Sequence, residues 1–220
     1  MSVCVAMKFK GGVILAADRR ITAGQRSYSG CKIWSTRWLG LGVGAVGSAA
    51  IDAALRYGLP DLMKPEDILD GKPFDIDYIS SVTVPMIFKM LKDNEIPNGG
   101  DPEYLNFQTL VCDPQHIFEI GGDRFALEHD DFAEIGCGQD YVHGYLANIY
   151  KKNMSLKEAT DVAVKAIQNS CGDSVFIGNG IDMIVVPDMD VMAKEKAAAK
   201  RKRKKAKEKK TQKGRETPQE

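Results

Sequence analysis

The sequence predicts an α+β domain over residues 2–190, followed by a tail rich in Lys and Arg over residues 191–220. Short apolar runs with β-branched residues occur near the start, in the middle and near the end of this domain, and segments with helical spacing of apolar residues lie between them. With 220 residues, of which 44% are hydrophobic, the chain can bury one substantial core.

The beginning of the chain predicts a hairpin that gathers polar side chains. Its two strands are expected at residues 3–9 and 13–17, joined by a turn at residues 10–12. A hairpin this tight returns Asp18, at the end of the second strand, to the side of Ser2, at the start of the first. Lys32 stands at the entrance of another apolar stretch. We therefore expect a hydroxyl, a carboxylate and a lysine to converge in a cleft lined by a sheet.

The rest of the domain is predicted to contain pairs of helices and further strands. The expected helices are 48–57, ended by Gly58-Leu59-Pro60; 75–94, with a kink at Pro85; 141–152; and 155–171, opened by a capping box of Ser155 and Glu158. The expected strands are 107–112 and 116–120, which form a hairpin, 125–127, 133–135, 175–177, and 181–186, ended by Pro187.

Ser2 has the chemistry of a nucleophile if the initiator methionine is removed, which a small second residue favours. Removal leaves the Ser2 hydroxyl and a free α-amine on one residue. A hydroxyl needs a base within hydrogen-bond reach, and an α-amine with a pKa of roughly 7.7–8.0 can serve at neutral pH. A Lys32 ammonium held by Asp18 would keep that amine neutral. A Met-Ser start is by itself more often an ordinary exposed terminus, so the argument depends on the residues that follow.

Residues 8–22 (KFKGGVILAADRRIT) resemble the opening of proteasome β-type subunits and of their bacterial relatives, HslV and the Anbu proteins. The mature chain in that family starts with threonine, whose position matches Ser2. The family's acid falls on Asp18 and its lysine on Lys32. The glycine whose backbone N–H stabilises the oxyanion falls on Gly44, within the run GVGAVGSA.

Further positions follow from the same resemblance, which extends to about residue 187. The glycine-flanked serine of the family matches Cys137, and a supporting aspartate matches Asp173. Ile21, Gly42 and Val46 would line the first specificity pocket, where a glycine leaves room for a large side chain. The implied fold is a four-layer αββα sandwich of the N-terminal nucleophile hydrolase type, whereas the order of elements alone supports only α+β.

Several positions depart from the family pattern. Serine in place of threonine lacks the methyl group that restricts the side-chain rotamer, so we expect slower chemistry. The segment between Asp18 and Lys32 is about two residues shorter than usual. Cys137 replaces a hydroxyl, and no Ser or Thr follows three residues after Asp173, which predicts a thinner polar network. No long propeptide precedes Ser2, as in HslV and Anbu, so methionine removal alone is expected to activate the chain.

Other classes of site find little support in the sequence. No apolar run reaches the roughly 18 residues that span a bilayer, and no secretory leader is evident. The five scattered cysteines form no Cys-x-x-Cys pair, which favours reduced cytosol. The three histidines lack metal-ligand spacing and are interpreted as surface or turn residues. The Gly-rich run 40–47 lacks the Lys-Ser/Thr ending of a phosphate loop. No cofactor or metal is expected.

The net charge of zero conceals an uneven distribution. Residues 194–220 carry 13 Lys and Arg against 4 Asp and Glu, while residues 1–193 carry 17 against 26. Such a basic tail cannot bury apolar area and is expected to stay solvated, as frayed helix or coil. The simplest interpretation is a solubilising extension. A tether for nucleic acid or for an ATPase ring is the alternative, although no aromatic residue is present for base stacking.

We therefore expect a cytoplasmic endopeptidase of the threonine-peptidase type that uses Ser2. The resemblance implies a homo-oligomeric ring that encloses the nucleophiles and receives unfolded polypeptide, with an ATPase unfoldase as a candidate partner. Two alternatives remain: a catalytically silent ring subunit, and a scaffold protein that binds nucleic acid through its tail. The nearly complete set of expected catalytic residues argues against a silent subunit.

Overall fold

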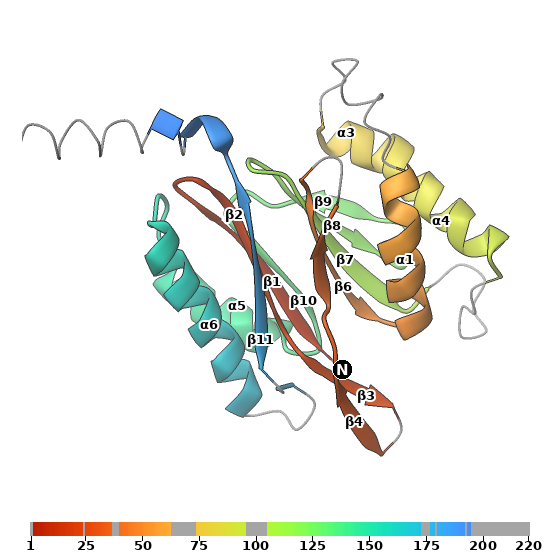
Figure 1. Ribbon diagram of the computed structural model, residues 1–220, viewed down its shortest axis with the longest axis horizontal. Coiled ribbons are helices and arrows are strands. Elements are labelled where there is room, and N and C mark those ends of the chain that lie inside the picture. Colours follow the sequence, from red (N-terminus) through yellow and green to blue (C-terminus); the bar gives the residue numbers. More distant parts are fainter. Residues whose placement is uncertain are drawn as a thin grey trace, which may run out of the picture.

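The computed structural model describes residues 2–23, 25–36, 40–62, 74–95, 105–172, 177, 178, 180–191, 193 and 194. Within these residues two β-sheets face each other, and helices cover the outer face of each sheet (Figure 1). The expected four-layer αββα sandwich is confirmed. Most of the basic tail lies outside the described residues. No helix within them has the length and apolar character needed to cross a membrane.

The first sheet contains the chain's N-terminal hairpin. Its strands are β1 (Val3–Phe9), β2 (Gly12–Asp18), β10 (Phe132–Gly136) and β11 (Ile181–Pro187), in the order β10-β1-β2-β11. All three neighbouring pairs are antiparallel, with Cys4 opposite Ala17 and Ile181 opposite Asp18. This register puts the start of β1 and the end of β2 at the same end of the sheet, as the sequence predicts.

The second sheet consists of consecutive antiparallel strands. They are β5 (Ile33–Ser35), β6 (Gly42–Gly47), β7 (Phe107–Cys112), β8 (Ile117–Gly121) and β9 (Ala126–Glu128). A separate ribbon of β3 (Arg20–Ala23) and β4 (Arg26–Ser29) projects beside the N-terminus (Figure 1). The sequence did not predict this ribbon, since its β4 residues are all exposed and show no apolar alternation.

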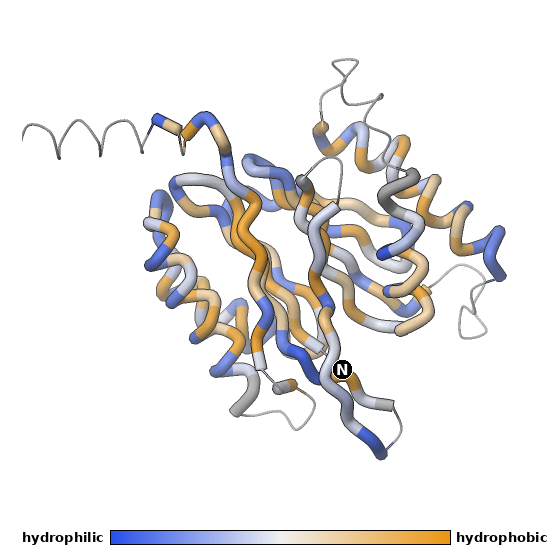
Figure 2. Tube along the Cα trace, in the orientation of Figure 1, coloured by the Kyte–Doolittle hydropathy of each residue, from blue (hydrophilic) through white to orange (hydrophobic). Residues whose placement is uncertain are grey.

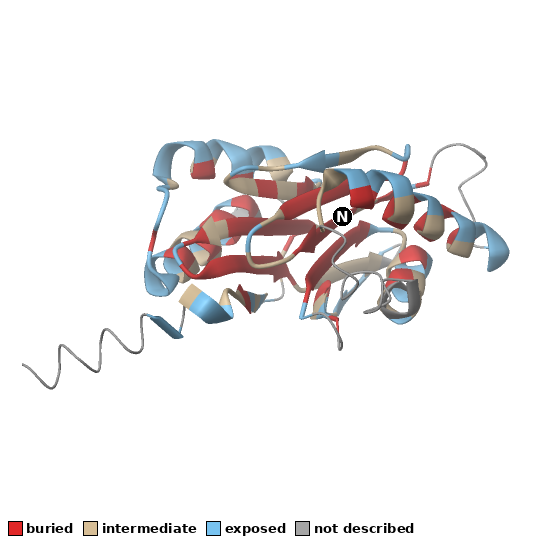
Figure 3. Ribbon diagram, turned by 90° about the horizontal axis from the view of Figure 1, so that it is seen from above, coloured by how far each residue is buried: buried red, intermediate tan, exposed pale blue. Residues whose placement is uncertain are grey.

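The helices form the two outer layers. The second sheet is covered by α1 (Ala49–Leu62), α3 (Ile76–Tyr78), the π-helical turn η1 (Ile79–Thr83) and α4 (Val84–Asp93). The first sheet is covered by α5 (Gln139–Ile149) and α6 (Leu156–Gly172). Figure 2 shows the apolar stretches of both sheets between the two helical layers, and Figure 3 shows that burial is concentrated in the strands.

Alternation along the strands builds three apolar layers from the two sheets. In β1, Val5 and Met7 pack under α5 and α6, whereas Cys4 points toward the second sheet. In β2, Leu15 also belongs to the layer between the sheets, where it meets Leu110 and other residues of the second sheet. Successive side chains of a strand face opposite ways, so a strand buried on both faces appears as a continuous apolar run.

The predicted capping box at Ser155 is present, whereas the predicted helix 75–94 is divided into α3, η1 and α4. The Ser155 backbone N–H donates to Glu158 Oε2 at 2.9 Å, and the Glu158 N–H donates to Ser155 Oγ at 3.3 Å, which completes the capping box. Pro85 has no N–H to donate, and the π-helical turn η1 ends immediately before α4.

The predicted end of the first helix is wrong. Helix α1 continues past Gly58 and Pro60 to Leu62. Gly58 leaves room inside the helix layer for Met90 of α4, since a Cβ at Gly58 would lie 2.1 Å from Met90 Sδ and would require that side chain to move. The missing N–H of Pro60 falls in the last turn, where it removes only one helical bond. The predicted strand 175–177 is not observed at Ile177, which is a bend, and its other two residues lie outside the described ones.

Truncating Leu15 tests the layer between the sheets. Leu15 is completely buried, so Leu15→Ala is expected to lower the free energy of unfolding by about 2–5 kcal/mol in a urea titration. Leu127→Ala is the control, since Leu127 is 52% exposed on β9 and its removal should cost less than about 1 kcal/mol. Equal losses in the two variants would contradict the assignment of the core.

Candidate active site

The Asp18 carboxylate is the centre of the candidate site. It is fully buried at the end of β2, and its Oδ1 accepts hydrogen bonds from the Val3 N–H at 2.9 Å and from Lys32 Nζ at 2.5 Å. Its Oδ2 accepts from the backbone N–H groups of Arg20 at 3.0 Å and Gly178 at 3.1 Å. Four donors thus compensate the charge that burial would otherwise make costly.

Lys32 links this carboxylate to the second sheet. Its side chain is buried and ion-paired with Asp18. Burial lowers the pKa of the Lys32 ammonium from its ordinary value, and the neighbouring Asp18 carboxylate opposes that change. The Lys32 carbonyl accepts a hydrogen bond from the Ala45 N–H at 3.0 Å, which fixes the lysine beside β6.

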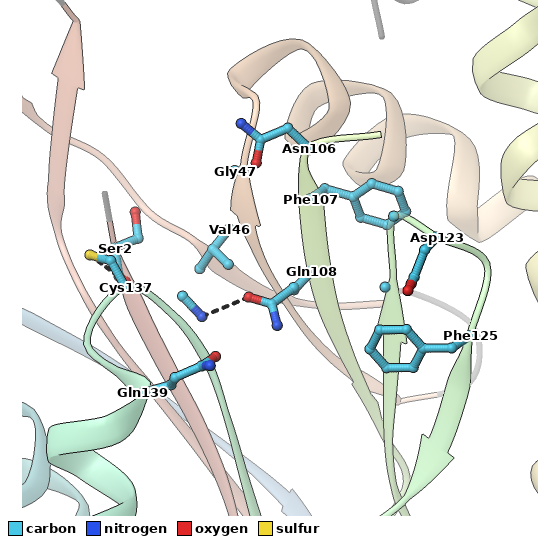
Figure 4. Close-up of a pocket in the computed structure, with 13 residues that line it drawn as sticks. Ser2, Val46, Gly47, Asn106, Phe107, Gln108, Asp123, Phe125, Cys137 and Gln139 are labelled. Carbon is cyan, nitrogen blue, oxygen red and sulfur yellow. Dashed lines mark hydrogen bonds between the residues drawn. The ribbon is translucent and has the colours of Figure 1, made fainter. Parts of the chain in front are cut away.

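Ser2 lies directly before this network and opens onto a cavity. It is half-buried, and the next residue, Val3, is the one that donates its N–H to Asp18. The cavity has a volume of about 480 Å³ and extends from Ser2 toward the second sheet (Figure 4). It is lined by Ser2, Val46, Gly47, Asn106, Phe107, Gln108, Gly121, Gly122, Asp123, Phe125, Gly136, Cys137 and Gln139.

The end of β10 forms the wall of the cavity beside Ser2. The exposed Cys137 thiol donates to the Ser2 carbonyl oxygen at 3.5 Å, and Figure 4 shows the two side by side. Gly136 has a φ of +95°, and a Cβ there would lie 2.3 Å from the Ser2 carbonyl oxygen. Only glycine therefore allows this close approach of the two backbones.

Only some of the expected site residues lie together in the structure. It brings Ser2, Asp18, Lys32 and Cys137 into one neighbourhood, as the preceding contacts describe. Asp173 lies outside the described residues. Gly44 is buried in the layer between the sheets, where a Cβ would lie 2.5 Å from Cys4 Sγ, and it is not among the residues that line the cavity.

Of the three residues expected to form the specificity pocket, one lines the cavity and two do not. Val46 lines the cavity next to Ser2. Gly42 faces the inter-sheet core, where a Cβ would lie 2.7 Å from a Val186 methyl group, so its small size serves packing. Ile21, on the projecting ribbon, packs against Gly30 and does not line the cavity. The alignment-based prediction that Gly42 widens the pocket does not fit this position.

Sequence reasoning missed much of the far wall of the cavity. Gln108 carried no clear signal, since it is followed by another polar residue, Thr109, in β7. Asp123 and Gln139 carried none either, because turns and helix starts commonly contain such residues, and Phe125 was expected only as a strand residue. They reach the cavity only because β7, β8 and α5 meet at this edge of the sandwich.

The histidines each contact a carboxylate near the surface or in a turn. His116 Nδ1 lies 2.9 Å from Asp113 Oδ2, His129 Nε2 lies 3.0 Å from Glu119 Oε2, and His143 is hydrogen-bonded to Glu134. In the part of the chain that the structure describes, no three His, Cys, Asp or Glu side chains are arranged to hold a metal ion.

Comparisons with known proteins relate this chain to proteasome subunits. The proteasome subunit family matches residues 111–186. Proteasome subunit beta 2 of Korarchaeum cryptofilum is 26% identical over 196 residues, covering 84% of this chain and 91% of the relative. Proteasome subunit beta 2 of Caldivirga maquilingensis is 28% identical over 193 residues, covering 83% and 88%.

Solved structures show the same fold. Thiobacillus denitrificans BPH has a TM-score of 0.69 at 21% identity, covering 84% of this chain and 97% of that one. Its complex with epoxomicin gives the same TM-score at 19% identity, covering 84% and 98%. The chain thus has the fold of the proteasome-like N-terminal nucleophile hydrolases. Its sequence resembles those of curated proteasome β subunits over more than four fifths of its length, which supports a relationship to the proteasome β-type subunits.

Replacing Lys32 tests the buried ion pair. Lys32→Met keeps the length of the side chain but leaves the Asp18 carboxylate without its cation, so the free energy of unfolding should fall by about 3 kcal/mol. Denaturant titration measures this loss. Lys157→Met, at an exposed position on α6, is the control and should change stability by less than about 0.5 kcal/mol. A similar small change in both variants would show that the pair is not formed.

Replacing Gly136 tests the contact between β10 and Ser2. Gly136→Ala adds a Cβ at positive φ and against the Ser2 carbonyl, so we expect a loss of about 1–3 kcal/mol in denaturant titration. Gly144→Ala on α5 is the matched control, because nothing lies within 4 Å of its added Cβ, and it should stabilise the helix by about 0.5–1 kcal/mol. A stable Gly136→Ala protein would contradict the close approach.

Proposed function

We propose that the chain is a proteasome-like endopeptidase that cleaves peptide bonds with Ser2, exposed by removal of Met1. The observation that carries the proposal is the Val3 N–H bond to Asp18, which holds the first residue of the mature chain beside the buried Asp18–Lys32 pair. Relationship to proteasome β-type subunits supports the class of reaction.

In the proposed reaction the Ser2 α-amine is the general base. It accepts the hydroxyl proton while Oγ forms a bond to the carbonyl carbon of the scissile peptide, and it then passes that proton to the departing amine as the C–N bond breaks. A water molecule then attacks the carbonyl carbon of the resulting ester and gives a proton to the same amine; the amine returns that proton to Ser2 Oγ as the C–Oγ bond breaks, which releases the acid and restores the serine. The Gly44 N–H is the proposed donor to the tetrahedral oxyanion, by resemblance.

The buried pair tunes this base rather than meeting the substrate. A Lys32 cation near the N-terminus disfavours a second positive charge and keeps the α-amine neutral and basic. Asp18 fixes both groups through its bonds to Lys32 and to the Val3 N–H. Cys137 and Asp173 are proposed supporting residues, and Val46 is the proposed substrate contact among the three expected positions.

The proposal also covers oligomeric assembly and cellular location. We propose a cytoplasmic homo-oligomeric ring, similar in organisation to HslV, that admits unfolded polypeptide with help from an ATPase. The domain over residues 2–190 would carry the reaction, and the tail over residues 191–220 would be an accessory extension. Removing the tail at Met192 should leave peptide cleavage intact.

Covalent labelling at Ser2 tests the function. An epoxyketone has two electrophilic carbons and can bond to both the Ser2 hydroxyl and its α-amine, so intact-mass analysis should show a chain without Met1 that carries one inhibitor. Ser2→Ala should abolish labelling and lower peptide cleavage by at least about 10³-fold. Ser2→Thr should retain both.

Cys137 requires its own control because its thiol is exposed beside Ser2. Cys137→Ser removes that competing nucleophile and should be labelled at Ser2 like the wild type. The proposed peptidase activity would be contradicted by a purified protein that retains Met1, or by labelling that survives Ser2→Ala. A catalytically silent ring subunit would then be the better interpretation.

A further inference from the structure

Gln108 connects the two sheets at the cavity that Ser2 also lines. It lies on β7, in the second sheet, opposite Gly121 of β8. Its side-chain Oε1 accepts a hydrogen bond from the backbone N–H of Gly136, on β10 of the first sheet, at 3.0 Å (Figure 4). Gly136 is the residue whose backbone packs against the Ser2 carbonyl oxygen.

The other end of the Gln108 amide is fixed by a carboxylate. Gln108 Nε2 donates to Glu119 Oε1 at 3.2 Å, and the second oxygen of Glu119 lies 3.0 Å from His129 Nε2. Glu119 is only 8% exposed. A backbone N–H can only donate and a carboxylate can only accept, so these two neighbours permit one orientation of the amide.

Gln108 also separates two cavities. One is the Ser2 cavity, and the other, of about 430 Å³, is lined largely by charged groups; Gln108 and Gln139 line both. The titratable side chains that line these two cavities with Gln108 are Glu119 on β8, Asp123 in the turn after β8, His129 after β9, Glu134 on β10, Cys137 after β10, and Asp140 and His143 on α5. Its surroundings are therefore mainly anionic.

We propose that Gln108 is a positioning residue for the reaction of Ser2. By holding the Gly136 peptide to the second sheet, it fixes the surface against which the Ser2 backbone rests and sets the distance between Ser2 and the opposite wall of the cavity. Glu119 acts behind it by fixing the direction of the amide. This inference rests on the proposed peptidase function, but the hydrogen bond itself can be tested separately.

Gln108→Met tests the positioning role. It keeps much of the side-chain volume and removes both hydrogen bonds, so kcat for a peptide substrate should fall about 10- to 100-fold while KM stays within about threefold. Hydrogen exchange at the Gly136 amide, followed by mass spectrometry, should become faster because the N–H loses its acceptor. Gln115→Met, at an exposed position in the β7–β8 turn, should change neither quantity.

Exchanging the amide and the carboxylate gives a sharper test. In Gln108→Glu two carboxylates face each other, so activity at neutral pH should fall. Once protonated, the introduced carboxyl group again presents one donor and one acceptor, so the ratio of variant to wild-type activity should rise as pH falls. In the double variant with Glu119→Gln, the new amide donates to the new carboxylate, which still accepts from Gly136. That variant should recover most of the lost activity at neutral pH.

The two proposals fail in different ways. A wild-type protein that cleaves no peptide overturns the proposed function, while exchange at Gly136 still decides whether Gln108 holds this wall. Unchanged exchange in Gln108→Met, an unchanged kcat in a cleaving enzyme, or a double variant as impaired as Gln108→Glu would each overturn the positioning role.

Discussion

The structure depends on how one buried carboxylate is satisfied. Asp18 collects donors from β1, from the β2–β3 junction, from Lys32 and from Gly178, which precedes β11. These donors are far apart in sequence, so the carboxylate joins the N-terminus, the second sheet and the last strand of the first sheet at one point. Losing any donor would leave a charge under-compensated in the interior, which is far costlier than losing a surface ion pair.

The two sheets meet beside Ser2 through a small number of polar contacts. Most of the inter-sheet layer is apolar and fixes only the spacing between the sheets. Lys32, just before β5 of the second sheet, and Gln108, on β7, each form a directional bond to the first sheet. Apolar packing tolerates small displacements, whereas hydrogen bonds require defined distances and angles. These two bonds therefore give the site its precision.

The sequence predicted what local geometry determines. The hairpin spacing placed Asp18 beside the start of β1, and short apolar runs located most of the strands of both sheets. It did not predict which way Gly42 and Gly44 would face, because that depends on how the sheets stack. Gln108 presented the same difficulty, since its partner Gly136 lies 28 positions away on the other sheet. The end of α1 was missed because the sequence does not reveal the packing of Gly58, whose missing side chain leaves room for Met90 of α4.

The residues of the candidate site differ in their exposure to the cavity. Asp18 and Lys32 are shut off from solvent, so a peptide in the cavity cannot contact them, while Ser2 is half-exposed on the cavity wall. An ion pair in a low-dielectric interior exerts a stronger field on a nearby amine than the same pair in water would. In the proposed reaction, water and substrate would not displace this pair, so its influence on the Ser2 amine would stay constant while the acyl group enters and leaves. A serine whose own amine is the base would need no second catalytic side chain in the cavity, which would leave the remaining wall free to bind the proposed polypeptide substrate.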